Sequence, residues 1–160
     1  MKRATICFPI RGSRILLGMK KHRLGVSDFG VGKWNGFGGK QEHDEPMPTV
    51  AIRELAEECG LIAAVKDLED VATIAFFGGD SPFYDCTIFL VRSWQGVPRE
   101  SDEMRPQWFY LANIPYDDMW SGDRFWLPLV LAGKKFDGTL RFKPDLKEVA
   151  SFDFVERAVG

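Results

Sequence analysis

The chain has 160 residues, a formal net charge of −2 and an isoelectric point of about 5.7. With 45% hydrophobic and 28% charged residues, it has the balance of one globular domain, so we expect residues 1–160 to fold as a single domain without a disulfide framework or a structural metal. The acidic balance argues against a basic groove for a nucleic-acid polymer, and it would repel any polyanion unless a metal ion were bound.

The elements expected along the chain are mostly strands. Ala4–Ile10 and Arg14–Lys20 have the composition of two strands joined by a tight turn. Trp34–Lys40 holds too many glycines for a strand, and its backbone should lie close to a neighbour. The later elements are a helix at Thr49–Cys59 ended by Gly60, a hairpin of Val71–Phe77 and Tyr84–Trp94, a short strand at Gln107–Leu111, a buried helix at Phe125–Ala132 and a strand at Phe136–Phe142. This order predicts an α+β fold, a mixed β-sheet flanked by helices.

The cysteines and the N-terminal segment bear on the cellular compartment of the protein. Cys7, Cys59 and Cys86 are widely spaced and form no CxxC pair, so the sequence indicates neither a zinc site nor disulfides. Reduced thiols in the cytoplasm are the simplest interpretation. Met1–Cys7 lacks the apolar run of a signal peptide, and no stretch approaches the ~20 apolar residues of a membrane helix. We therefore expect a cytoplasmic monomer that contacts neither a membrane nor a nucleic-acid polymer.

The helix expected at Thr49–Cys59 carries the most informative pattern. Glu54, Glu57 and Glu58 have the spacing i, i+3, i+4 and fall within an arc of about 100°, which we expect to face solvent. The apolar residues expected on the core face are Ile52, Leu55, Ala56 and Cys59. Such an acidic stripe is most often a solvated surface. Crowded carboxylates repel one another, however, and Mg²⁺ bound by carboxylates and substrate phosphates would neutralise them.

The residues around this helix decide between the two interpretations. Gly39 is followed after five residues by Glu45, after seven more by Arg53-Glu54-Leu55, and then by Glu57-Glu58 and Gly60-Leu61. This spacing resembles the Nudix box, G-x5-E-x7-R-E-U-x-E-E-x-G-U with U apolar, at every fixed position. The resemblance implies a Nudix fold with a loop–helix–loop catalytic motif. It also implies hydrolysis of a phosphoanhydride bond by water, with Mg²⁺ as cofactor and Mn²⁺ as a substitute.

The resemblance assigns roles to individual residues. The metal ligands that it implies are the carbonyl of Gly38 and the side chains of Glu54, Glu57, Glu58 and Glu103. Glu103 is also a candidate general base. Arg53, counted with the catalytic glutamates, would brace the loop–helix–loop together with Glu45. No covalent intermediate is implied, so His22 and His43 are expected to be surface histidines.

The similarity extends beyond the box to one branch of that family, the MutT-homologue oxidised purine nucleoside triphosphatases. The segments that carry it are Leu16–Lys21, Trp34–Lys40, Glu100–Pro106, Asp118–Trp120, Leu127–Leu129 and Lys134–Phe136. That branch hydrolyses 8-oxo-dGTP and related nucleotides to the monophosphate and pyrophosphate. The resemblance therefore implies nucleotide-pool sanitation, which prevents DNA damage.

The same branch implies a substrate site. The residues expected to bind substrate are Thr5, Lys20, Phe29, Asn35, Phe37, Gly38, Gly39, Lys40, Trp120 and Asp123. Trp120 would stack on the base and Lys20 would face the phosphates, while the polar side chains would contact the base edge. From the residues alone, Asn35 could equally mark an Asn-Gly turn, and Asp123 could equally cap a helix.

The sequence departs from that branch at two places and leaves other functions open. Gly122-Asp123 stands where the mammalian enzymes have two adjacent aspartates, and about five extra residues lie near Leu24–Asp28. Both changes lie beside the expected base pocket, so the preferred purine stays open. The alternatives are a Nudix hydrolase for another modified nucleotide or a dinucleotide polyphosphate, and a nucleotide-binding module without catalysis. The intact set of glutamates argues against the last alternative.

Overall fold

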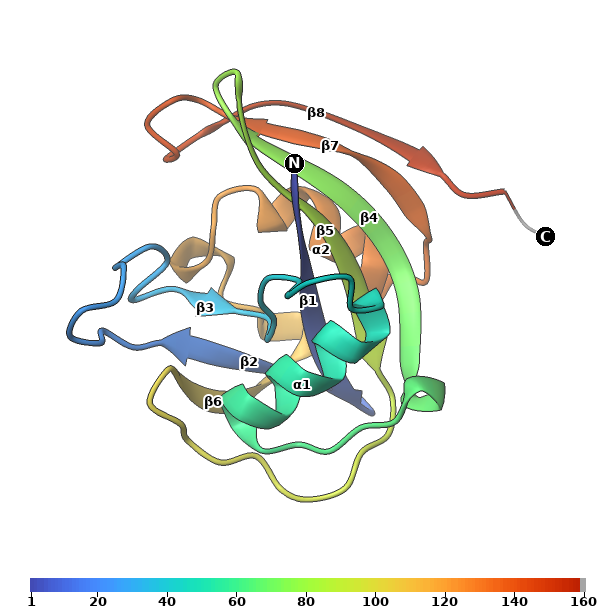
Figure 1. Ribbon diagram of the computed structural model, residues 1–160. Helices are drawn as coiled ribbons and strands as arrows, with labels where there is room; N and C mark the ends of the chain where they lie inside the picture. Colours follow the sequence, from blue (N-terminus) through green and yellow to red (C-terminus); the bar gives the residue numbers. More distant parts are fainter. Residues whose placement is uncertain (159–160) are drawn as a thin grey trace.

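A mixed eight-stranded sheet with one helix on each face forms the centre of the protein (Figure 1). The computed structural model describes residues 1–158, so residues 159–160 of the expected domain lie outside the described residues. The strands are β1 (Lys2–Arg11), β2 (Arg14–Lys20), β3 (Trp34–Asn35), β4 (Leu68–Gly78), β5 (Ser81–Val91), β6 (Met104–Tyr110), β7 (Phe136–Phe142) and β8 (Val149–Glu156). The helices are α1 (Met47–Cys59) and α2 (Asp123–Leu131), with short 3₁₀ turns at Val65–Asp67, Leu111–Asn113 and Tyr116–Asp118. The predicted α+β class is confirmed.

The order of the strands places β1 at the centre. The order is β3-β2-β1-β5-β4-β7-β8, and β6 pairs with β2. β1 is parallel to β5 along most of its length and antiparallel to β2 at its end. In the β2–β6 pair, Lys20 lies opposite Met104. The end of β2 and the segment before β6 therefore meet at one edge.

Each helix covers its own apolar core. Val50, Leu55 and Cys59 of α1 pack with Cys7 of β1 on one side of the sheet, which we call the α1 face. On the opposite side, the α2 face, Trp126 and Leu127 of α2 pack with Phe8, Ile74 and Leu140. The three cysteines are all free and buried in these cores. Burial raises the pKa of the Cys59 and Cys86 thiols to about 12.

Most expected elements are present with bounds within three residues of the expected ones, but Trp34–Asn35 forms the short strand β3 in a segment where no strand was expected. α1 begins at Met47 rather than Thr49, because the first turn of a helix tolerates Pro48. Its end is as expected, since Gly60 adopts a left-handed φ of 77° and its N–H donates to the carbonyl of Ala56. The edge strand β8 was not expected; it pairs only with β7, and most of its side chains are exposed.

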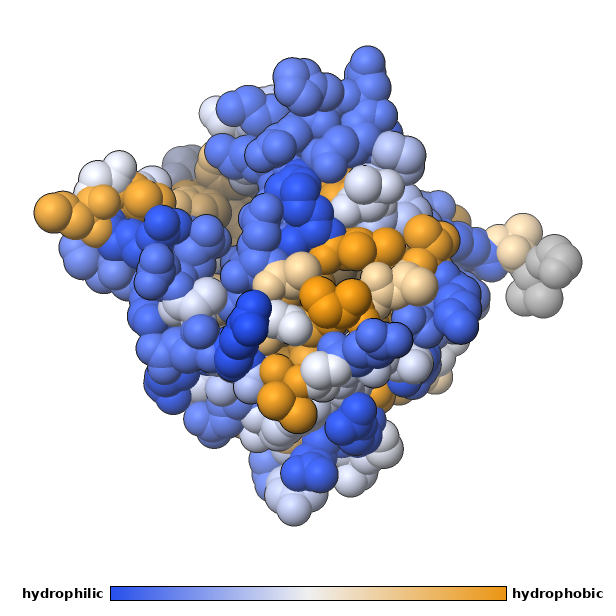
Figure 2. Space-filling model, turned by 60° about the horizontal axis from the view of Figure 1, so that its bottom comes forward, coloured by the Kyte–Doolittle hydropathy of each residue, from blue (hydrophilic) through white to orange (hydrophobic). Residues whose placement is uncertain are grey.

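Polar and apolar residues are unevenly distributed on the surface. Figure 2 shows one face on which polar residues surround an apolar area. Exposed apolar side chains on the segments after α1 and β5 are Ile62, Val65 and Val97. Single exposed apolar residues are common at protein surfaces and carry no functional argument. Within residues 1–158, no helix is both long and apolar enough to cross a membrane.

Candidate active site

The glycine-rich segment before α1 pairs with β1 through backbone hydrogen bonds. Phe37 exchanges two backbone hydrogen bonds with Cys7, and Thr5 N–H donates to the carbonyl of Gly39. A Cβ at Gly38 would lie 1.8 Å from the carbonyl oxygen of Thr5, so no larger residue fits there. The expected close backbone approach of this segment is confirmed, and it brings the N–H of Gly38 to the end of α1.

Glu58 is buried, which corrects the expectation that it faces solvent. Its side chain is only 6% exposed, and Oε1 accepts a hydrogen bond of 2.7 Å from the N–H of Gly38. Burial raises the pKa of Glu58 well above its ordinary value, and the charges of Glu54 and Glu103 raise it further. Ile52 and Ala56, expected in the core, are only half-buried. The helix is therefore rotated so that Glu58 points inward, because the glycine loop offers it a donor.

Glu54 lies beside Glu58 and is held by Arg53. Burial raises the pKa of Glu54 to about 7, as does the charge of Glu57, whereas Arg53 lowers it. Arg53 Nη1 donates to Glu54 Oε1 over 2.7 Å. The rest of the guanidinium binds both carboxylate oxygens of Glu45 and the carbonyl of Lys40. Arg53 and Glu45 thus link the loop to the helix in the expected manner.

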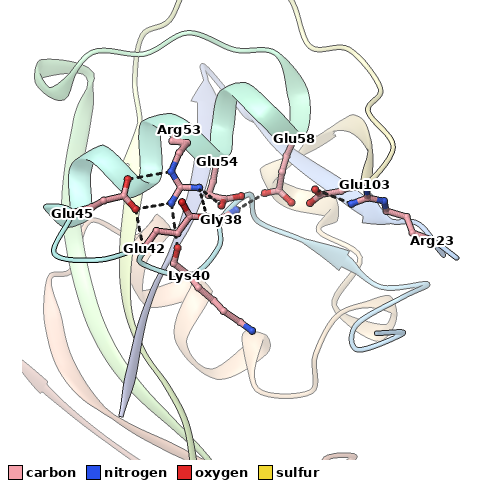
Figure 3. Close-up of polar contacts among 9 residues, drawn as sticks. All are labelled: Arg23, Gly38, Lys40, Glu42, Glu45, Arg53, Glu54, Glu58 and Glu103. Carbon is pink, nitrogen blue, oxygen red and sulfur yellow. Dashed lines mark hydrogen bonds and ion pairs between the residues drawn. The ribbon is translucent and has the colours of Figure 1, made fainter. Parts of the chain in front are cut away.

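Glu103 completes a row of three carboxylates, which Figure 3 shows beside the ends of α1 and β2. It comes from the segment before β6, where Ser101 Oγ accepts hydrogen bonds from the N–H groups of Glu103 and Met104. Lys21 N–H donates to the carbonyl of Glu103 over 2.8 Å. These contacts fix the backbone of Glu103, so its side chain reaches the row from a rigid base.

The row has the chemistry of a site for a hard divalent cation. The hydrogen bonds to Glu54, Glu58 and Glu103 all engage Oε1, which leaves Oε2 of each to bind an ion. Oxygen ligands of this kind suit Mg²⁺. In residues 1–158, no group of three or more His, Cys, Asp or Glu side chains is already arranged around an ion position.

An aromatic pocket of about 130 Å³ opens on the α2 face of the sheet. Its lining consists of Ile6, Phe29, Phe76, Phe83, Tyr84, Cys86, Trp120, Asp123, Phe142 and Leu146. The rings of Phe29 and Trp120 lie 4.9 Å apart, and the lining is apolar apart from a few polar groups. Asp123 is the first residue of α2 rather than its cap, and burial raises the pKa of this carboxyl to about 7. The pocket thus offers aromatic rings and one carboxyl to a flat ligand.

Lys20 connects the pocket to the carboxylates. Its ammonium donates to the backbone carbonyl of Phe29, and its charge lowers the pKa of Glu58. Lys40, in contrast, is exposed, with its ammonium 5.7 Å from the ring of Tyr84. A nucleotide with its base in the pocket would therefore place its phosphates near Lys20 and the glutamate row.

The structure does not bring three of the expected base-contacting residues to this pocket. Side chains alternate along a strand, so Thr5 shares the α1 face with Cys7, while Ile6 lines the pocket. Asn35 donates to the carbonyl of Lys33, and Phe37 is buried in the α1 core. Of the residues expected to contact the base, Trp120, Asp123 and Phe29 line this pocket. His22 and His43 are exposed, as expected.

Several functional candidates were missed. Phe76 of β4 and Tyr84 of β5 lie opposite each other in the sheet register, and both line the pocket. The period-2 pattern of these strands could have found them, because Cys86 lies two residues after Tyr84 on the same face. Lys33 lies 5.3 Å from the ring of Trp120, and Arg23 contacts Glu103; neither had a sequence signal.

Comparisons with known proteins agree with this geometry. The family model of the NUDIX domain matches residues 1–130. Proteins named oxidized purine nucleoside triphosphate hydrolase from Danio rerio and Mus musculus are each 44% identical to this chain. The match to the Danio rerio protein covers 89% of this chain and 87% of that protein. The match to the Mus musculus protein covers 92% of this chain and 96% of that protein. A crystal structure of a mutator MutT protein from Bacillus halodurans has a TM-score of 0.81 at 23% identity, covering 96% of this chain and 97% of that chain.

Proposed function

The chain belongs to the NUDIX domain family, and we propose that it is a Mg²⁺-dependent hydrolase that converts 8-oxo-dGTP and similar oxidised purine nucleoside triphosphates to the monophosphate and pyrophosphate. The observation that carries this proposal is a row of carboxylates that Lys20 links to an aromatic pocket. The 44% identity to two relatives with that printed activity supports the substrate class. A role in cleansing the nucleotide pool of the cytoplasm follows, and the three free cysteines fit that compartment.

The roles that we propose follow from the contacts of each residue. The groups that would hold the metal are the side chains of Glu54, Glu57, Glu58 and Glu103 and the carbonyl of Gly38. Mg²⁺, or Mn²⁺ in its place, would supply charge stabilisation at the phosphates and an activated water. Arg53 orients Glu54, and Gly38 N–H orients Glu58. Glu103 is a half-exposed member of the row, so it is our candidate to accept the proton of the attacking water.

One comparison of substrates tests the proposal. The purified protein with Mg²⁺ is expected to hydrolyse 8-oxo-dGTP with a much higher kcat/KM than dGTP and to release pyrophosphate rather than phosphate. The panel should include 2-hydroxy-dATP, dATP and a dinucleotide polyphosphate. Equal, slow turnover of dGTP and 8-oxo-dGTP would rule out the sanitation role.

A second candidate is a NUDIX hydrolase for a different modified nucleotide, which Gly122 favours. A Cβ at Gly122 would lie 2.9 Å from Leu140 and 3.2 Å from Phe142. A larger side chain beside Asp123 would therefore require the side chains of Leu140 and Phe142 to shift. The same substrate panel separates the two candidates, since preference for 2-hydroxy-dATP or the dinucleotide would select this one.

Trp120→Ala is expected to raise KM for the preferred triphosphate about tenfold or more, because stacking a base on an aromatic ring contributes about 1–3 kcal/mol. The ring of Trp120 lines the pocket next to that of Phe29. Steady-state kinetics measure the effect. Trp108→Ala is the control, since Trp108 stacks on Trp94 instead of lining the pocket. An unchanged KM for Trp120→Ala would mean that the ring does not stack on the base.

Asp123→Asn is expected to gain stability relative to the wild type as pH rises from about 4 to about 7. The folded protein raises the pKa of Asp123 from 3.8 to about 7, so it binds this proton more tightly than the unfolded chain does. The free energy of unfolding of the wild type therefore falls as pH rises from about 4 to about 7. Asp123 contributes at most about 1.4 kcal/mol per pH unit to this fall and nothing further above about pH 7. Asparagine does not titrate.

Denaturant unfolding at several pH values measures this difference. Asp118→Asn is the matched control, because it is the same chemical substitution at an exposed position. A stability difference between Asp123→Asn and the wild type that stays constant from pH 4 to pH 7 would contradict the buried, protonated carboxyl.

A further inference from the structure

Arg23 contacts the carboxylate row from the loop that follows β2. Its Nη1 donates to Glu103 Oε1 over 3.1 Å, and the two side chains are 38% and 44% exposed. A pair this exposed contributes little to folding, because water screens it. The contact therefore places a cation beside Glu103 without holding the fold together.

The other cations near the row already have partners. All donor nitrogens of Arg53 engage Glu45, Glu54 or the carbonyl of Lys40. Lys21 binds Glu100 over 2.6 Å and the carbonyl of Ser101. Among residues 1–158, the side chain of Arg23 has one polar partner, the exposed carboxylate of Glu103, so exchanging that partner costs little free energy.

We propose that Arg23 binds the terminal phosphates of the triphosphate and releases Glu103 to do so. The inference rests on the proposed function, because it needs a triphosphate lying over the glutamate row. A planar guanidinium matches the phosphate oxygens with two parallel hydrogen bonds, which makes arginine well suited to this contact. In a chain of net charge −2, it also adds positive charge where the polyanion enters.

The contacts around Glu103 explain why this exchange is local. Lys21 N–H and Ser101 Oγ fix the backbone of Glu103, so only the side chain needs to turn toward the metal. Arg23 lies two residues after Lys21. Its backbone therefore stays beside the row when the side chain of Glu103 turns away from Arg23. Glu103 and Arg23 would then each bind the substrate complex, one through the metal and one through phosphate.

The test compares Arg23→Gln with Arg92→Gln. Arg92 forms a similar exposed pair with Glu69 at 3.2 Å, on β4 and the end of β5, away from the row. The probes are the α,β-methylene analogue of 8-oxo-dGTP and the product 8-oxo-dGMP, each titrated calorimetrically with Mg²⁺ present. Arg23→Gln is expected to bind the analogue about tenfold more weakly, as for loss of one charge-assisted hydrogen bond. Binding of 8-oxo-dGMP should stay within about twofold of the wild type, and Arg92→Gln should match the wild type for both.

Two results would overturn the inference. Equal analogue affinities for the two variants would show that Arg23 does not contact the phosphates. Unchanged analogue affinity with tighter Mn²⁺ binding, measured by electron paramagnetic resonance, would show that Arg23 only shields Glu103 from metal. Failure of the proposed function is separate, because it appears as absent hydrolysis by the wild type, while the binding measurements still test Arg23.

Discussion

Glu58→Gln is expected to lower kcat on the order of a thousandfold while leaving the metal-free protein at least as stable as the wild type. The amide keeps an oxygen that can accept the hydrogen bond from Gly38 N–H. It loses the charge that would hold the metal, so turnover falls. Burial and the charges of Glu54 and Glu103 already disfavour the ionised form of Glu58 in the metal-free protein, so a neutral amide at this position does not weaken the fold.

Two measurements separate catalysis from folding in this variant. Steady-state kinetics with Mg²⁺ give kcat, and thermal unfolding without metal gives Tm. Glu148→Gln is the control, since Glu148 is exposed and pairs with Lys143 far from the row. A large fall in Tm for Glu58→Gln, with activity lost only in proportion to unfolding, would show that Glu58 serves the fold rather than the reaction.

Glu58 also shows how far the sequence predicts the site. The spacing of the box identified the glutamates, and helical periodicity correctly grouped them on one part of α1. Helical periodicity does not show which edge of that stripe packs against the rest of the protein. A buried carboxylate needs a donor, and here the donor is Gly38 N–H, twenty residues earlier in the chain. The inward orientation of Glu58 is therefore a tertiary effect that no local pattern contains.

The pocket was predicted less completely than the carboxylate row. Trp120 and Asp123 were expected and do line it, but Ile6, Tyr84 and Phe142 come from three different strands. They meet only because β1, β5, β4 and β7 are neighbours in the sheet, an order that single-strand patterns do not specify. Thr5 and Ile6 illustrate the same limit, because neighbouring side chains of one strand point to opposite faces and only Ile6 lines this pocket.

Gly38→Ala is expected to destabilise the protein by about 3 kcal/mol or more, as severe overpacking does. The added Cβ would lie 1.8 Å from the carbonyl oxygen of Thr5 and 2.6 Å from its carbonyl carbon. These atoms belong to the backbone of β1, so they cannot move without breaking the hydrogen bonds between β1 and the glycine segment. Denaturant unfolding measures the loss, and a change below about 1 kcal/mol would contradict this packing.

Gly39→Ala provides the contrast, because its added Cβ meets a flexible side chain instead of a backbone. The Cβ would lie 2.5 Å from Cδ of Glu54 and 2.6 Å from its Oε1. Glu54 can rotate away, so the fold should survive with a small change in Tm. The rotation displaces a proposed metal ligand and breaks its contact with Arg53, so kcat/KM is expected to fall about a hundredfold. Measuring Tm and kcat/KM for both alanine variants tests the pair, and retained activity in a folded Gly39→Ala protein would exclude Glu54 from the metal site.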